Sequence, residues 1–232
     1  MADFDFEQFR QDVLEGVSNA ADAVSSAAKG AGDEVKRFRH FNEVGRDLFV
    51  SGSTTSHGGN LSECDGSTIW ITKSGTMLGH LMPGDIVDVG WEFSVRDTPA
   101  SMELVVHRAI YHALAELDAQ AQRPFAPRAV IHAHTKYTVL RSLVEDTITP
   151  QDSEGRMLLG ETVPVLAVEP AVASEKVAEA LATHVREGGR IAVIKGHGPF
   201  AIADTLEEAY RLISCLEYSS ELATHLDMLK KM

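Results

Sequence analysis

Three histidines are the residues of this chain best suited to chemistry. His132 and His134 lie two positions apart in the strand-like run 129–134, and alternation along a strand directs both rings to the same side. That spacing suits chelation, although such a pair also occurs by accident in ordinary strands. His197 lies in the glycine-rich turn 195–199, between two strand-like runs, where flanking glycines leave its ring sterically open.

Three neutral imidazoles form a donor set that suits Zn²⁺ or another divalent ion such as Mn²⁺ or Co²⁺. Because three protein ligands leave coordination positions open for a substrate, the set indicates catalysis rather than a structural metal. The two cysteines, Cys64 and Cys215, form no CxxC motif, so neither a disulfide framework nor a thiolate metal site is indicated. We expect both to be buried or half-buried side chains.

A predicted helix that opens at Ser101 adds a carboxylate to this set. Glu103, His107 and Tyr111 follow one another at intervals of four, so they share one face of that helix. Glu103 is either a partner of the helix dipole or, beside a cation, a general base. His107 and Tyr111 are interpreted as supports of that face rather than as reacting groups.

Two loops have the composition of anion-binding turns. The segment 58–60, Gly-Gly-Asn, offers backbone N–H groups that no Cβ obstructs, and Ser74 with Gly75 offers a hydroxyl and another free amide. Neither loop matches a nucleotide-binding motif, and each by itself is also an ordinary turn.

The elements that must position these residues alternate between strands and helices. Short β-branched runs predict strands at 68–72, 86–89, 129–134, 163–168, 191–194 and 200–203. Apolar periodicity and N-terminal capping residues predict helices at 35–49, 101–117, 174–186 and 205–229. Strands that pair locally and are then covered by helices predict an α/β fold, a single-domain α/β/α sandwich around a largely antiparallel central sheet.

Composition excludes several classes of protein. The chain has 232 residues and a net charge of -13, so its field repels nucleic-acid backbones and anionic lipid surfaces. We therefore expect no nucleic-acid partner and no membrane partner, and a cytoplasmic location, because no export signal or spanning segment is recognisable. Residues 1–33 are predicted to form an N-terminal helical arm, and 34–232 a catalytic domain.

Five short motifs occur in an order and spacing that resemble the class II aldolase/adducin family. They are Gly-Asn-Leu-Ser at 59–62, Ile-Thr-Lys-Ser-Gly at 71–75, Ser-Met-Glu at 101–103 followed by His107, His-Ala-His at 132–134, and Gly-His-Gly at 196–198. The enzymes of that family include L-fuculose-1-phosphate aldolase and L-ribulose-5-phosphate 4-epimerase. The resemblance extends from about residue 35 to the C-terminus.

The resemblance implies a role for each matching position. His132, His134 and His197 would hold Zn²⁺, and Glu103 beside it would be the catalytic acid/base. The substrate's phosphate would lie against Gly59, Asn60, Ser74, Gly75 and Ser101. Enzymes of the family are commonly homotetramers with the active site at a subunit boundary, and the aldolases add a tyrosine from the neighbouring subunit that matches no position here.

The function that the resemblance implies is a zinc-dependent lyase. It would cleave a ketose phosphate such as L-fuculose 1-phosphate to dihydroxyacetone phosphate and an aldehyde. One departure from the family pattern leaves the substrate open: Met102 stands where a second serine is usual, and a thioether cannot donate a hydrogen bond to a phosphate.

Three alternatives remain at this point. A metal-dependent decarboxylase of a 3-oxo acid would use the same groups, and so would a pentulose-phosphate 4-epimerase, although such epimerases typically carry Asp in place of Glu103. An adducin-like interaction module would keep the fold without a working metal site, which the three histidines and Glu103 disfavour.

Overall fold

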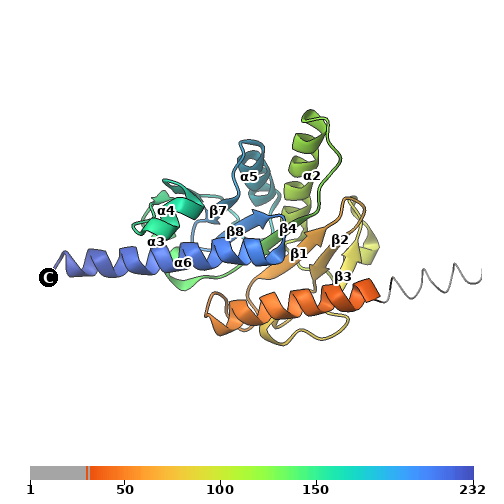
Figure 1. The fold of residues 1–232 in the computed structure, drawn as a ribbon, viewed down its shortest axis with the longest axis horizontal. Coiled ribbons are helices and arrows are strands. Elements are labelled where there is room, and N and C mark those ends of the chain that lie inside the picture. The colour runs from red at the N-terminus through yellow and green to blue at the C-terminus, as the bar shows by residue number, and fades with distance from the viewer. Residues whose placement is uncertain (1–29, 31) are drawn as a thin grey trace, which may run out of the picture. The chain divides into compact units, whose positions relative to one another are not determined.

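The computed structural model describes residue 30 and residues 32–232 (Figure 1). The chain divides into two units, Met1–His40 and Phe41–Met232, and all of the candidate site residues belong to the second. The predicted arm 1–33 lies almost entirely outside the described residues, so it stays a prediction. Residues 32–50 are helical, which includes the helix expected at 35–49.

An eight-stranded sheet forms the centre of the second unit, with the strand order β3-β2-β1-β4-β8-β7-β6-β5. The strands are β1 (Asn60–Cys64), β2 (Ile69–Thr72), β3 (Ile86–Val89), β4 (Arg128–His132), β5 (Thr147–Ile148), β6 (Val163–Leu166), β7 (Ile191–Ile194) and β8 (Gly198–Ala203). Every neighbouring pair is antiparallel except β6 and β7, which are parallel. The prediction of a largely antiparallel sheet is therefore confirmed.

Helices cover both faces of this sheet (Figure 1). They are α2 (Leu104–Gln120), α3 (Lys136–Ser142), α4 (Ser153–Leu159), α5 (Glu175–Arg186) and α6 (Leu206–Leu229), with short 3₁₀ turns η1 (Leu78–His80) and η2 (Val95–Asp97). Helices α2 and α5 pack against each other on one face, whereas α6 crosses β1, β4 and β8 on the other. The three layers confirm the predicted α/β/α sandwich.

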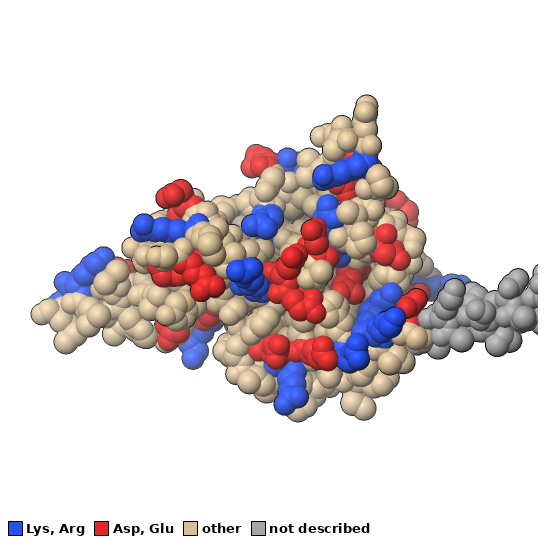
Figure 2. All heavy atoms as spheres, in the orientation of Figure 1, with Lys and Arg blue, Asp and Glu red and all other residues tan. Residues whose placement is uncertain are grey.

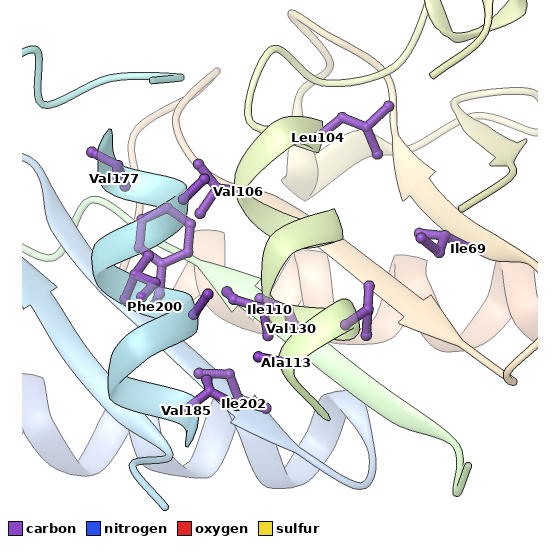
Figure 3. Close-up of a cluster of buried hydrophobic side chains, with 14 of the residues drawn as sticks. Ile69, Leu104, Val106, Ile110, Ala113, Val130, Val177, Val185, Phe200 and Ile202 are labelled. Carbon is purple, nitrogen blue, oxygen red and sulfur yellow. The ribbon is translucent and has the colours of Figure 1, made fainter. Parts of the chain in front are cut away.

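An apolar core lies between the sheet and the pair α2 and α5 (Figure 3). Val130, Phe200 and Ile202 enter it from β4 and β8 because they occupy alternate positions on one face of the sheet. Their neighbours Ile131 and Ala201 are buried on the opposite face. Because side chains alternate between the two faces along β4 and β8, this register determines which of them pack against α2. It also directs His132 to the face of the sheet that α2 covers.

The structure differs from the sequence prediction at several elements. Strand β1 begins at Asn60, which was expected to lie in a loop, and α2 begins at Leu104 rather than at Ser101. Strand β4 ends at His132, so His134 lies beyond the strand. Helices α3 and α4 and the two-residue strand β5 were not predicted, because segments so short show no hydrophobic period.

The surface and the cysteines agree with the composition. Figure 2 shows acidic and basic side chains interspersed on the face in view, as expected of a solvated exterior. Among the described residues, no helix is both long and apolar enough to cross a bilayer. Cys64 is buried and Cys215 is half-buried, and both are free thiols, as expected.

Candidate active site

The rings of His132, His134 and His197 converge on one point. The Nε2 atom of His132 lies 3.0 Å from Nε2 of His134 and 3.2 Å from Nε2 of His197. One ring nitrogen from each residue lies within 4.8 Å of the other two. The three side chains that the sequence analysis grouped thus lie together, although His132 alone belongs to a regular strand.

Backbone geometry brings the three rings together. The carbonyl of Pro199 accepts a hydrogen bond from Nδ1 of His132 at 3.1 Å, which leaves the Nε2 lone pair directed at the other two rings. Two glycines permit the close approach. A Cβ at Gly58 would lie 2.6 Å from Nδ1 of His134, and one at Gly198 would lie 2.1 Å from the carbonyl oxygen of Ala133.

Burial keeps these imidazoles neutral. It lowers the pKa of His132 well below its usual value, helped by the neighbouring His197 and His134. Burial also lowers the pKa of His134, and it lowers that of His197 to about 4. All three rings therefore carry an unprotonated nitrogen at neutral pH, which is the form that binds a metal ion.

The cluster fits a divalent cation. Ligand nitrogens at about 2.0–2.1 Å from one tetrahedral ion lie about 3.3 Å apart, close to the 3.0 and 3.2 Å observed. The donor set contains nitrogen only, and Nε2 of His132 faces a ring nitrogen of each of the other two histidines. Three converging imidazoles are a ligand set that suits Zn²⁺, Co²⁺ or Mn²⁺.

Glu103 lies at the N-terminal end of α2 with its side chain in the interior. It is only 5 % exposed, and its Oε1 accepts a hydrogen bond from the backbone N–H of Ala173 at 2.9 Å. Its other oxygen, Oε2, is buried without a hydrogen-bond partner among the described residues. Desolvation raises the pKa of this carboxyl above its ordinary value, although the Ala173 N–H partly offsets the shift.

A single cavity of about 120 Å³ is lined by all nine residues to which the sequence assigned a role. These are Gly59, Asn60, Ser74, Gly75, Ser101, Glu103, His132, His134 and His197. Backbone pairing explains how distant segments meet there, since Lys73 forms a β-bridge with Ala100 and the N–H of Ser101 donates to the carbonyl of Thr72. This pairing joins the 72–75 loop to the start of α2.

Four further residues line the cavity and were given no role from the sequence: His57, Lys73, Met102 and Val172. Lys73 is the most significant, because it adds a positive charge beside Ser74. The motif 71–75 had drawn attention to its serine and glycine, and the lysine within it was the signal that could have been used. Met102 is 69 % exposed, so its thioether stands at the edge of the cavity toward solvent.

His107 and Tyr111 lie on the same face of α2 as Glu103, as predicted, and both are completely buried. The Oγ of Ser62 lies 2.6 Å from Nδ1 of His107 and 2.7 Å from the hydroxyl of Tyr111. Neither residue lines the cavity, which agrees with their predicted supporting role.

Comparison with known proteins identifies the family. Residues 39–224 match the family described as Class II Aldolase and Adducin N-terminal domain, so the chain belongs to the class II aldolase/adducin family. The resemblance inferred from the five motifs is thus confirmed, as is the inference that the chain is an enzyme of this class.

Relatives and solved structures similar to this chain include L-fuculose phosphate aldolases and methylthioribulose-1-phosphate dehydratases. A crystal structure of L-fuculose-1-phosphate aldolase from Thermus thermophilus is 32% identical with a TM-score of 0.75, covering 84% of this chain and 95% of that one. L-fuculose phosphate aldolase of Methanocaldococcus jannaschii is 26% identical, over 83% of this chain and 98% of its own length. Methylthioribulose-1-phosphate dehydratase of Methylococcus capsulatus is 28% identical, over 82% and 93%.

Proposed function

We propose that the chain is a zinc-dependent aldolase that cleaves a ketose phosphate, such as L-fuculose 1-phosphate, to dihydroxyacetone phosphate and an aldehyde. One observation carries the proposal: three imidazole nitrogens and an unpartnered, buried carboxylate oxygen line the same cavity. An aldolase needs an electrophile and a proton carrier within reach of one substrate, and this cavity offers candidates for both.

His132, His134 and His197 would hold the cation. A divalent ion bound there would supply Lewis-acid polarisation of a substrate carbonyl. Cation binding would release no proton from the three rings, since burial already keeps them neutral. Val172 and Met102 also line the cavity, and both are more than half exposed, so they lie where the cavity opens to solvent.

Glu103 would move the proton. The N–H of Ala173 fixes Oε1, so Oε2 is the oxygen left to exchange a proton with the substrate. Its raised pKa suits this task, because a proton carrier is most effective when its pKa is near the working pH. Burial thus gives the carboxyl both its orientation and its basicity.

The same cavity would also hold the substrate's phosphate. The Oγ of Ser101 accepts the N–H of Glu103 at 3.2 Å, which leaves the hydroxyl proton of Ser101 available to an anion. Ser74, Gly75 and Asn60 line the same region. Lys73 adds a cationic group there, which compensates for the hydrogen-bond donor that Met102 cannot supply.

A dehydratase acting on a ketose phosphate is the second candidate. It is favoured by relatives named methylthioribulose-1-phosphate dehydratase, which match at 25–28% identity. Removal of a proton next to a carbonyl, followed by loss of water, would use the same carboxylate. The two reactions differ in whether a C–C or a C–O bond breaks, so product analysis separates them.

The catalytic domain 34–232 is proposed to form homotetramers with the cavity near a subunit boundary. Apolar side chains beside the His197 turn support this assembly. A Cβ at Gly196 would lie 3.3 Å from Leu143, and Leu143 and its neighbour Val144 are 56% and 81% exposed. Apolar groups exposed next to a site are typical of surfaces that a second subunit covers.

The test combines metal analysis with a single substitution. We expect about one Zn²⁺ per chain in the purified protein and cleavage of L-fuculose 1-phosphate or a related ketose phosphate. Glu103→Gln should keep the metal while turnover falls at least ~10²-fold, as expected for loss of a general base. Glu175→Gln, which changes an exposed carboxylate at the start of α5, is the matched control and should keep full activity.

Each outcome distinguishes among the alternatives. Unchanged turnover in Glu103→Gln would rule out its proposed role. Release of water from methylthioribulose 1-phosphate would favour the dehydratase, and release of CO₂ from 3-oxo acids would favour a decarboxylase. Purification without stoichiometric metal would contradict the proposed cation site.

A further inference from the structure

Phe200 lies against the His132 ring on the side away from the cavity. The two rings are stacked, with centroids 4.2 Å apart and planes 15° apart. They are cross-strand neighbours in the β4–β8 register, so the stack is fixed by the sheet itself. Phe200 is fully buried and belongs to the apolar cluster drawn in Figure 3.

His107 contacts the same phenylalanine from α2. Its ring lies edge-on to Phe200, with centroids 6.1 Å apart and planes 68° apart. His107 cannot move easily, because its Nδ1 is hydrogen-bonded to Ser62 of β1, and Ser62 is hydrogen-bonded in turn to Tyr111. The three polar side chains are all completely buried, and each lies on an element that packs against the sheet or belongs to it.

This network has an energetic cost that packing alone does not explain. Nε2 of His107 is buried and has no hydrogen-bond partner in the part of the chain that the structure describes. A buried polar atom without a partner destabilises the fold, and an apolar side chain of similar shape would avoid that cost. Burial also lowers the pKa of His107 to about 3, so the ring stays neutral beside a site for a cation.

We propose that His107 and Phe200 are positioning residues that fix the plane of the His132 ring, and with it the direction of its metal-binding Nε2 lone pair. The inference rests on the proposed metal site and adds to it the residues that set its geometry. The Pro199 carbonyl holds one edge of the His132 ring through Nδ1, but a single hydrogen bond permits tilting about that contact. Phe200 blocks the tilt, and the Tyr111–Ser62–His107 set keeps Phe200 in place.

The experiment measures metal binding rather than turnover. Zn²⁺ affinity and the visible absorption spectrum of the Co²⁺-loaded protein are compared for the parent, Phe200→Leu and Tyr111→Phe. Phe200→Leu removes the stack and should weaken Zn²⁺ binding about 10- to 100-fold, the usual effect of losing a partner that orients a ligand. Its Co²⁺ absorption bands should shift because the ligand field changes. Tyr111→Phe removes only one hydroxyl and should give a smaller shift in the same direction.

Ile202→Val is the matched control. Ile202 lies two residues along β8 on the same sheet face and in the same cluster, but its cross-strand partner is Val130 and not a histidine. Its shortening should lower the melting temperature and leave both the Zn²⁺ affinity and the Co²⁺ spectrum unchanged. The pair therefore separates loss of stability from loss of ligand orientation.

The results that would overturn the inference are specific. Parent-like affinity and spectrum in Phe200→Leu would show that the stack does not orient His132, while the metal site itself would stand. If Phe200→Leu does not fold, Tyr111→Phe decides, and a parent-like Co²⁺ spectrum in that variant overturns the inference. Failure of the parent protein to bind Zn²⁺ or Co²⁺ would overturn the proposed function instead, and this result differs from the two outcomes that overturn the inference alone.

Discussion

Helices α2 and α6 both begin beside a hydroxyl that accepts the backbone N–H of a glutamate, and the side chains of the two glutamates, Glu103 and Glu208, lie in opposite environments. At α6, the hydroxyl of Thr205 accepts the N–H of Glu208 at 3.2 Å, and the Glu208 side chain is exposed. At α2, the hydroxyl of Ser101 accepts the N–H of Glu103 at 3.2 Å, and the Glu103 side chain is buried. Each start has a hydroxyl that satisfies an otherwise free N–H and a carboxylate close to the positive end of the helix dipole.

The difference lies in what each helix start faces. Glu208 faces solvent, where a carboxylate near a helix N-terminus contributes about 0.3–1 kcal/mol at low salt. Glu103 faces the cavity with the three histidines, where desolvation raises its pKa. At α2, a carboxylate favoured by the helix dipole is also buried, which is unfavourable for its charged form. At α6 the carboxylate is exposed and no such conflict arises. Conflicts of this kind are typical of functional sites.

The largest effect is expected when the hydroxyl at the start of α2, that of Ser101, is removed. Ser101→Ala should lower kcat/KM about 10- to 100-fold, because it removes a donor to a charged group worth about 1.5–3 kcal/mol. Steady-state kinetics with a ketose phosphate would measure it, with most of the effect in KM. If the loss appears equally with an unphosphorylated ketose, Ser101 acts through Glu103 and not through the phosphate.

Most of the fold could be predicted from sequence because apolar residues recur in most of its helices and strands at the spacing typical of each. The strands Ile86–Val89 and Ile191–Ile194 were predicted at their observed bounds. Strand β1 was missed because it reads Asn-Leu-Ser-Glu-Cys, a composition that is poor in strand formers. Its polar residue Ser62 faces inward to hydrogen-bond His107 and Tyr111, so burial there follows from partners that are distant in sequence.

The candidate site was predicted more completely than the fold around it. The His-x-His spacing and the glycine-flanked His197 identified a cluster whose ring nitrogens the structure brings together. The sequence left Glu103 open between dipole partner and base, because its burial depends on the loop that carries Ala173. Phe200 was missed because its significance lies in the His132 ring that it contacts across the sheet, which no local pattern encodes. Lys73 was missed although it lies within the 71–75 motif, because attention went to the serine and glycine that follow it.

Thr205→Ala tests the other side of the comparison and should have a smaller effect. Loss of this cap should lower the free energy of unfolding by about 1 kcal/mol, with no change in kcat or KM. For a protein of this size that corresponds to a fall in melting temperature of about 2–4 °C. Thermal unfolding and kinetics on the same preparation would measure both. A fall in activity as large as that of Ser101→Ala would mean that the two helix starts are not functionally different.

The smallest expected effect is on the free energy of unfolding, which Glu103→Gln and Glu208→Gln should change in opposite directions. Because burial raises the pKa of Glu103 above its ordinary value of 4.5, the folded protein binds that proton more tightly than the unfolded chain does. The parent therefore loses stability relative to Glu103→Gln as pH rises from about 4.5 through the raised pKa. Below that window both side chains are neutral and the difference should disappear.

Glu208→Gln should behave in the opposite way. It removes a favourable interaction with the helix dipole and should lower the stability at neutral pH by about 0.3–1 kcal/mol at low salt. Denaturant unfolding of the metal-free protein between pH 4 and pH 8 would compare the variants without the stabilising effect of a bound ion. If Glu103→Gln were also less stable than the parent at pH 7, burial of this carboxylate would carry no cost. The contrast in stability between the two carboxylates would then disappear.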